Sequence, residues 1–213
     1  MHLLGQGAKH AVQRWIDLPP GYRERRKRLL NRRFTVVSND CWGAEVYKDL
    51  DLPFDTPLIG TFIMAPCFLR IAADAERILR SPLAFVPASR FEEVEELKRG
   101  WRPFPTGTLD DGRVEIQFMH YGSEDEARSK WERRVERSHF DRLFFKLSGD
   151  KDRFGDAEFA AFDALPIRKI AFSAKSRPGL SSVITIPGYD RDGKTMYKIT
   201  LAHFDVVNWL NQD

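Results

Sequence analysis

Apolar and polar residues alternate along the chain in blocks that predict both strands and helices. Residues 34–38 form a short, almost wholly apolar run, which is typical of a strand buried on both faces of a parallel sheet. Residues 42–50, directly after it, have the spacing of an amphipathic helix. Further strands are predicted at residues 58–64, 83–86, 114–121, 143–147, 170–173, 183–186 and 196–201, and further helices at residues 9–18, 66–79, 156–165 and 205–211. Because strands and helices alternate, we predict an α/β fold with a mainly parallel or mixed central sheet.

Two Ser-x-x-Glu sequences predict where two more helices begin. Ser89 with Glu92 opens an acidic helix that ends near Gly100, and Ser123 with Glu126 opens a second helix. In this arrangement the serine oxygen accepts a hydrogen bond from the backbone N–H three residues later, and the glutamate accepts one from the serine N–H. Both serines are therefore predicted to cap a helix.

A dense group of basic side chains precedes the first core strand. Arginine and lysine fill most positions from Arg23 to Arg33, and only Glu24 opposes them. The stretch is typical of a solvated helix, although clustered cations also attract anionic lipid headgroups or anionic carbohydrate. No aromatic residues are interleaved with the charges, which disfavours nucleic acid as a partner. We divide the chain into a basic N-terminal helical arm, residues 1–33, and a single α/β domain, residues 34–213.

Composition and charge narrow the class of protein. Of the 213 residues, 42% are hydrophobic and 31% are charged, and the net charge is +3. These values are ordinary for a soluble globular protein, and the net charge is too small to indicate nucleic-acid binding. Cys41 and Cys67 form no Cys-x-x-Cys pair, so we expect free thiols and a reducing compartment. With no signal-peptide pattern, and an apolar stretch at residues 58–69 too short to span a bilayer, we predict a cytoplasmic protein.

The turn from Ser38 to Gly43 concentrates reactive side chains at the end of the first predicted strand. In α/β proteins, strand ends and helix N-terminal N–H groups converge on a crevice where ligands bind. Cys41 is a candidate nucleophile because a helix N-terminus lowers the pKa of a thiol, and Ser38 is its rival. The Asn39 amide and nearby backbone N–H groups are candidates to hold a developing oxyanion.

Each residue of this turn also has a purely structural interpretation. A free cysteine is usually buried and inert, Asp40 is suited to cap the following helix, and Trp42 is suited to pack in the core. Ligand binding by the whole turn, with Asp40, Trp42 and Gly43 included, is a broader hypothesis than nucleophilic attack by one atom.

Two more strand ends carry groups that suit the same crevice. His120 ends the strand predicted at residues 114–121, and it can serve as general base to Cys41 or Ser38 if that strand runs parallel to the first. It is otherwise a polar residue at the end of a half-exposed strand. Lys146 is a lone cation in an apolar strand, so it needs an anionic partner. That partner is either a ligand phosphate or carboxylate, or an internal carboxylate.

Metal and nucleotide signatures are weak or absent in the sequence. The histidines and cysteines have no metal-ligand spacing, so we predict no metal site. The Asp110-Asp111 pair resembles the acidic pair with which many sugar-nucleotide enzymes hold a metal, but Gly112 after it favours a simple turn. The chain contains no Gly-x-Gly-x-x-Gly or phosphate-loop pattern, which disfavours a nicotinamide enzyme or a phosphate-loop hydrolase.

At these residues the chain resembles a bacterial family of unknown function found in exopolysaccharide and capsule biosynthesis loci. The resemblance covers roughly residues 30–175. It rests on the order of several motifs, namely Ser38–Gly43, Leu52–Pro57 with Gly60, Pro105–Gly107, Glu115–Tyr121, Ser123–Ala127, Lys130–Arg134 and the strand of Lys146. Asparagine is common in the family where Asp40 stands, and a second glycine where Ala44 stands. The carboxylate reverses the hydrogen-bond polarity that an amide has at that position.

The resemblance implies a three-layer α/β fold and a role in building surface polysaccharide. We therefore expect an enzyme that transfers an acyl or acetyl group, for instance from a coenzyme A thioester, to a polysaccharide precursor. Cys41 or Ser38 is its expected nucleophile and His120 its base. Ligand binding is assigned to a further set of residues, Asn39, Asp40, Trp42, Gly43, Asp55, Thr56 and Lys146.

Two alternatives remain open. In the first, the crevice binds a sugar nucleotide for glycosyl or phosphoryl transfer, and Asp110, Asp111 or Asp55 holds a divalent ion. In the second, the protein is a non-catalytic partner of a polysaccharide assembly, peripheral to the inner membrane, which it contacts through Arg23 to Arg33.

Overall fold

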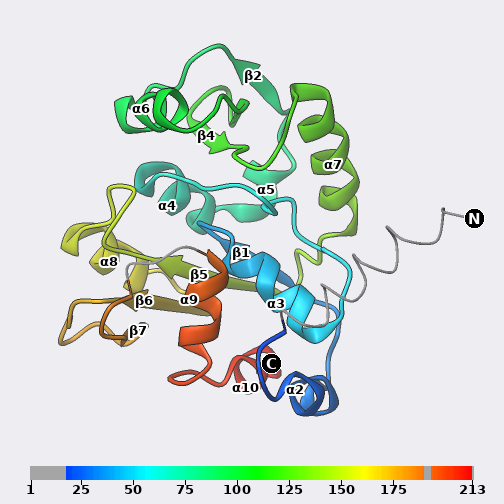
Figure 1. Cartoon of the computed structure of the whole chain (residues 1–213), viewed down its shortest axis with the longest axis vertical. Coiled ribbons are helices and arrows are strands. Elements are labelled where there is room, and N and C mark those ends of the chain that lie inside the picture. The colour runs from blue at the N-terminus through cyan, green and yellow to red at the C-terminus, as the bar shows by residue number, and fades with distance from the viewer. Residues whose placement is uncertain (1–17, 190–192, 213) are drawn as a thin grey trace, which may run out of the picture.

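Two β-sheets organise the protein (Figure 1). A computed structural model describes residues 18–189 and 193–212. The larger sheet is wholly parallel, with the order β1-β5-β6-β7, where β1 is Thr35–Ser38, β5 Leu143–Ser148, β6 Lys169–Ser173 and β7 Val183–Thr185. The smaller sheet is antiparallel, with the order β2-β3-β4, where β2 is Ala84–Val86, β3 Thr106–Leu109 and β4 Val114–Gln117.

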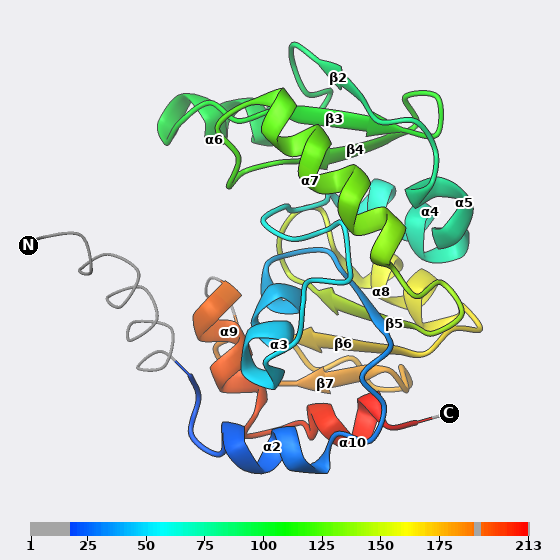
Figure 2. The same cartoon turned by 90° about the vertical axis from the view of Figure 1, so that its right-hand side faces the viewer.

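Helices cover both faces of the parallel sheet, as Figure 2 shows. Val36 and Phe144 pack into one buried cluster, on the face covered by α3 (Trp42–Leu50), α9 (Gly193–Thr200) and α10 (Val206–Leu210). The neighbouring Val37 and Phe145 pack into a second cluster, because successive strand residues point to opposite faces. This second face is covered by α4 (Ala65–Ala73) and α8 (Asp156–Asp163). The prediction of a three-layer α/β fold is confirmed.

The smaller sheet belongs to the same domain. Its buried residues Leu109, Val114 and Ile116 join the cluster formed by α4 and α8, so both sheets share one core. The remaining helices on this side of the molecule are α5 (Ala75–Leu79), α6 (Glu92–Gly100) and α7 (Glu124–Arg137). The core is thus continuous from the parallel sheet to the antiparallel one.

Local signals place most element boundaries correctly. The helix predicted at residues 42–50 is α3, the strand at 143–147 is β5, and the helix at 205–211 contains α10. Ser123 caps α7 as predicted, since its side chain accepts a hydrogen bond from the N–H of Glu126. The helix predicted at residues 9–18 lies outside the described residues except for its last position.

Three predictions about elements are wrong. Residues 58–64 form turns with a single β-bridge at Phe62, because the positive φ of Gly60 breaks the extended backbone. Residues 196–201 lie mainly in helix α9 rather than in a strand. Ser89 does not cap α6, whose N-terminal cap is Phe91. The Ser89 hydroxyl instead donates a 2.6 Å hydrogen bond to Glu115 on the smaller sheet.

The described part of the basic arm packs against the domain. In α2 (Tyr22–Arg28), Arg25 donates two hydrogen bonds to the buried carboxylate of Asp49 in α3, at 2.5 and 2.8 Å. Arg28 pairs with Asp205, next to α10. Arg25 and Arg28 therefore stabilise the packing of the arm on the domain. The cations that stay exposed, and so could contact an anionic membrane, include Lys27 and Arg32. Over the described ranges, no helix combines the length and the apolar character that a membrane crossing needs.

Candidate functional site

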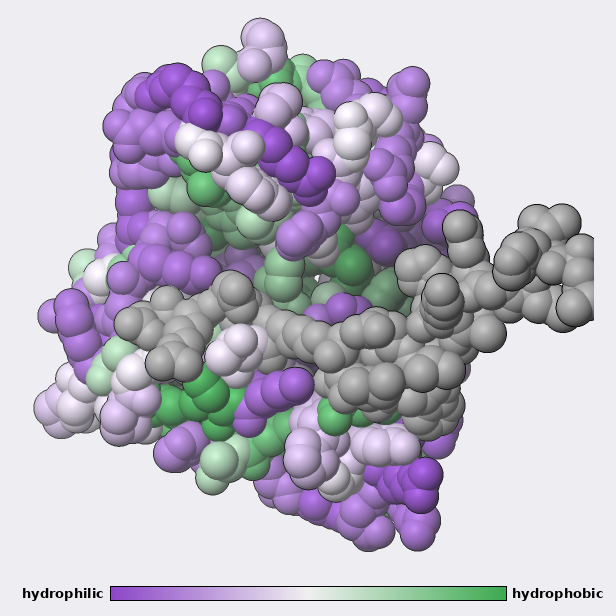
Figure 3. Space-filling view, in the orientation of Figure 1, coloured by the Kyte–Doolittle hydropathy of each residue, from purple (hydrophilic) through white to green (hydrophobic). Residues whose placement is uncertain are grey.

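A cleft of about 720 Å³ opens between the parallel sheet and the smaller sheet. Figure 3 shows the surface hollowed at this level, with hydrophobic side chains inside the hollow. Its lower wall includes Cys41 at the N-terminus of α3, Lys48 in the last turn of that helix, and Lys151 from the loop after β5. Its upper wall includes Trp101, which follows α6, and His120, which follows β4. The volume lies within the range of about 300–1,000 Å³ that is typical of small-molecule sites.

His120 lines this cleft, but the structural reason differs from the one that the sequence predicted. The strand β4 ends at Gln117, belongs to the antiparallel sheet and does not run beside β1, so the predicted reason for its proximity to Cys41 is wrong. His120 instead lies in the turn after β4, where its backbone N–H donates a 3.1 Å hydrogen bond to the carbonyl oxygen of Gly60. A Cβ atom at Gly60 would lie 3.1 Å from the Cβ of His120, so a glycine there permits the close approach.

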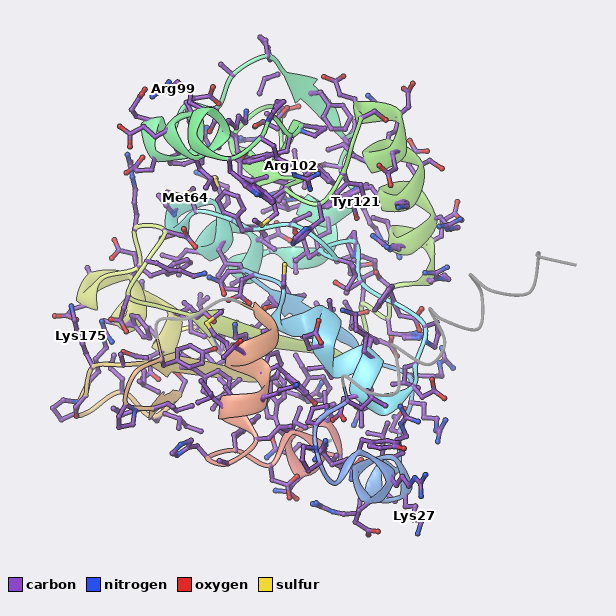
Figure 4. All side chains as sticks on the ribbon, in the orientation of Figure 1. Lys27, Met64, Arg99, Arg102, Tyr121 and Lys175 are labelled. Carbon is purple, nitrogen blue, oxygen red and sulfur yellow. The ribbon has the colours of Figure 1, made fainter. Side chains whose placement is uncertain are left out.

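The surroundings of His120 favour a neutral imidazole. Burial lowers its pKa below the ordinary value of 6.5, and the positive charges of Arg102 and Lys48 lower it further. Figure 4 labels Arg102 above the parallel sheet, on the side of the smaller sheet. The Trp101 ring packs against the imidazole edge to face, at 6.4 Å between ring centroids. At neutral pH, His120 is therefore able to accept a proton.

Cys41 lines the cleft but is not an activated thiolate. It lies at the predicted strand-to-helix junction, where it occupies the N-cap position of α3. Burial, together with the neighbouring Asp40 carboxylate, raises the pKa of the Cys41 thiol to about 11. Burial and the negative charge of Asp40 thus act against the lowering of the thiol pKa that is expected at a helix N-terminus. Attack by Cys41 requires a base to remove its proton.

Ser38 and Asn39 form the framework beneath the cleft. Ser38 is 2% exposed, its hydroxyl contacts Asp40 Oδ1 at 3.2 Å, and it is not among the described residues that line the cleft. The Asn39 side chain donates to the carbonyl oxygen of Ser148 at 2.9 Å and accepts from its N–H at 2.8 Å. The Asn39 side-chain amide thus connects the ends of β1 and β5, in the way that backbone hydrogen bonds connect neighbouring strands. These hydrogen bonds direct the amide at the backbone of Ser148 and not at a ligand.

Replacing Asn39 with alanine should therefore lower the free energy of unfolding by about 1–3 kcal/mol, because the backbone N–H and carbonyl of Ser148 lose their partners in a buried environment. Urea unfolding followed by circular dichroism measures the change. Asn208→Ala on the exposed surface of α10 is the control and should change stability little. An Asn39→Ala protein as stable as wild type would contradict the framework role.

Lys146 has an internal partner rather than a ligand. Its side chain is fully buried, and its ammonium group donates a 2.7 Å hydrogen bond to Asp40 Oδ1 and another to Ser148. Burial raises the pKa of Asp40, but the Lys146 ammonium outweighs burial and holds that pKa well below its usual range. Lys146 does not appear among the described residues lining the cleft, so the internal-carboxylate alternative is confirmed.

Trp42 and Gly43 hold α3 against the sheet. The buried indole of Trp42 donates a 3.0 Å hydrogen bond to Thr200 and packs against Phe172. A Cβ atom on Gly43 would lie 3.1 Å from the Cβ of Ser38, so glycine permits the helix to approach β1 closely. Both residues position the turn and are not among the described residues of the cleft wall.

Asp55 and Thr56 lie at the opposite end of the parallel sheet. The backbone oxygen of Asp55 accepts a hydrogen bond from Thr35, the first residue of β1, and its carboxylate lies 3.4 Å from Arg137 and 3.7 Å from His139. Thr56 is buried. Neither residue lines the cleft of Cys41 within the described residues, so their assignment to the same ligand is not supported.

The Asp110-Asp111 pair does not form a metal site. The Asp110 carboxylate pairs with the side chains of Arg77 and Arg113, at 2.6 and 3.1 Å, and it lies in the turn after β3. The charge of the carboxylate is thus compensated by arginine side chains. Across residues 18–189 and 193–212, no group of three or more histidine, cysteine and acidic side chains is placed to hold a metal ion.

The sequence reasoning missed Trp101, Lys151 and Asp152, which all line the cleft. Burial and the Asp40 carboxylate raise the pKa of Asp152 against the attraction of Lys151. The loop after β5 has positive φ angles of 52° at Asp152 and 65° at Arg153. Non-glycine residues with such backbone angles cluster at functional sites, but the angles are not readable from residue types alone.

Comparisons with known proteins place the chain in a family. The profile described as "Domain of unknown function (DUF1919)" matches residues 20–211. A protein of Haemophilus influenzae, described as uncharacterized, is 32% identical over 199 residues, which cover 87% of this chain and 87% of that protein. The match to the profile includes α2, both sheets and every described residue of the cleft wall. The chain therefore belongs to the DUF1919 family.

Proposed function

We propose that the protein is a transferase that acylates a hydroxyl group of a polysaccharide precursor, with His120 as the general base of a direct transfer. The observation that carries this proposal is the presence of His120 and Cys41 in the wall of one cleft. Burial and nearby cations lower the pKa of the His120 imidazole, which favours its neutral form, whereas burial raises the pKa of the Cys41 thiol to about 11. The resemblance of the Ser38–Gly43 turn to capsule and exopolysaccharide proteins supports the choice of acceptor.

In the proposed step, the acceptor hydroxyl oxygen attacks the carbonyl carbon of an acyl thioester, and a ring nitrogen of His120 takes the hydroxyl proton. The new C–O bond forms as the C–S bond breaks, and the thiolate of the donor leaves with the electron pair and takes up a proton. Lys48 and Lys151 on the lower wall, with Arg102 near the upper wall, supply positive charge that suits the phosphates of a coenzyme A thioester.

Replacing Cys41 with alanine should leave acyl transfer within about twofold of wild type, since a direct transfer forms no enzyme thioester. The assay follows release of free coenzyme A from acetyl-coenzyme A in the presence of capsule precursor saccharides. Acetylation of the saccharide, read by mass spectrometry, is the second readout. A folded Cys41→Ala protein without activity would contradict direct transfer and restore the covalent mechanism.

The sugar-nucleotide alternative shares the cationic wall but loses its predicted metal ligands, since arginines pair with Asp110 and with Asp55. Thermal shift separates the two hypotheses, because a ligand that binds only the folded state raises Tm. The proposed function expects a shift with acetyl-coenzyme A. A shift with uridine-diphosphate sugars and none with coenzyme A would select the alternative.

A further inference from the structure

One buried oxygen at the edge of the cleft lacks a partner. Asp40 is 5% exposed and lines the cleft. Its Oδ1 accepts hydrogen bonds from Lys146, at 2.7 Å, and from the backbone N–H of Trp42, at 3.0 Å. Its Oδ2 is also buried, but it has no hydrogen-bond partner among residues 18–189 and 193–212. Buried polar atoms are nearly always paired, so this oxygen indicates a donor that residues 18–189 and 193–212 do not supply.

The charge of Asp40 restricts the chemistry of that donor. Lys146 already neutralises the carboxylate through a buried ion pair. A cationic ligand would bring a second positive charge next to the buried ammonium, which is unfavourable. A neutral donor needs no further compensation. The unpartnered oxygen is therefore suited to a hydroxyl group rather than to an amine cation.

The opposite wall offers an exposed apolar surface. Among the described residues, three large hydrophobic side chains are exposed, and two of them, Trp101 at 50% and Leu97 at 38%, line this cleft. The Arg102 guanidinium stacks on the Trp101 ring at 4.6 Å, and His120 packs against it edge to face. Both contacts hold the indole in place at the cleft wall. An exposed, held aromatic ring binds a ligand that has an apolar face.

We infer that the cleft binds a pyranose sugar, whose apolar ring face packs on Trp101 and whose hydroxyl group donates a hydrogen bond to Asp40 Oδ2. A sugar ring combines these two properties, because its C–H groups form an apolar face and its hydroxyls are neutral donors at the rim. The inference deepens the proposed function by naming a class of ligand for the cleft. Only the identification of this sugar as the acyl acceptor rests on the proposed function. Trp101 and Asp40 are binding residues for this sugar.

Saturation-transfer difference NMR tests the inference on the full chain without any acyl donor. The probes are N-acetylglucosamine, methyl glucoside and methyl galactoside, each added separately. We expect saturation transfer to the ring C–H protons of at least one sugar with wild-type protein. Trp101→Ala should weaken that binding about tenfold, whereas Trp101→Phe should retain most of it. Leu30→Ala, which removes an exposed apolar side chain outside the cleft, is the matched control and should change nothing.

Asp40→Asn gives the second variant. The asparagine oxygen can keep the contact with Lys146, and its NH₂ group then replaces the unpartnered oxygen, so a hydroxyl donor loses its acceptor and binding should weaken about tenfold. If this variant fails to fold, the two Trp101 variants decide the result. Absence of binding to all three sugars by wild type, or equal binding by Trp101→Ala, overturns the inference. Sugar binding without acyl transfer in the separate assay overturns only the proposed function.

Discussion

Replacing His120 with glutamine should lower kcat/KM for acyl transfer by about 10²–10⁴-fold, the usual contribution of a positioned general base. Glutamine keeps the approximate size of the side chain and a hydrogen-bonding end but cannot accept the hydroxyl proton at neutral pH. The structure should tolerate the change, because the His120 side chain is only partly buried and the turn is held by the backbone hydrogen bond to Gly60. The change should therefore affect the rate and not Tm.

The pH dependence distinguishes a base from a residue that only shapes the cleft. A general base works as the neutral imidazole, so wild-type kcat/KM should rise with pH through the pKa of His120 and then level. Burial and the nearby cations lower that pKa, which places the acid limb below 6.5. His120→Gln should lose this limb, and the exposed His203→Gln, outside the cleft, should keep it. A His120→Gln enzyme with the wild-type limb would contradict the assignment.

Sequence reasoning located one wall of the cleft because its signals are local. The apolar run at residues 34–38, the small polar residues after it and the helical spacing at residues 42–50 are each set within a few residues of the chain. The structure gives this turn the predicted position at the end of a parallel strand. The side-chain roles differ from the prediction, because Asn39 and Lys146 are satisfied by partners more than a hundred residues away.

The other wall depends on pairing that no local pattern specifies. His120 follows a strand whose alternating residues predict β structure, but the choice between a parallel neighbour and an antiparallel hairpin is made by β3. Trp101 lies in a loop rich in helix breakers, where residue type does not predict placement.

The strand predicted at residues 196–201 is wrong for a similar reason. Met196, Tyr197 and Thr200 are buried at helical spacing, and this packing outweighs the local preference of the stretch for β structure.

Replacing Lys146 with methionine should destabilise the protein by about 3–5 kcal/mol, the cost of breaking a buried ion pair from one side. Methionine fills a similar volume but leaves the Asp40 carboxylate buried beside it without a cation. Chemical denaturation at neutral pH measures the loss. Lys175→Met is the matched control, since Lys175 is exposed near the end of β6 (Figure 4), and it should change stability by about 0.5 kcal/mol or less.

The double variant Asp40→Asn/Lys146→Met should recover much of this stability, because no charge is then left buried. The pH dependence has a defined sign. In wild type, Lys146 lowers the pKa of Asp40, so the stability from their pair is present above the ordinary value of 3.8 and is lost as the pH falls toward the lowered pKa. In Lys146→Met the isolated Asp40 carboxyl is easier to protonate. The loss of unfolding free energy relative to wild type should therefore be smaller at acidic pH. A Lys146→Met protein with wild-type stability at neutral pH would show that the pair contributes nothing to the fold beneath the cleft.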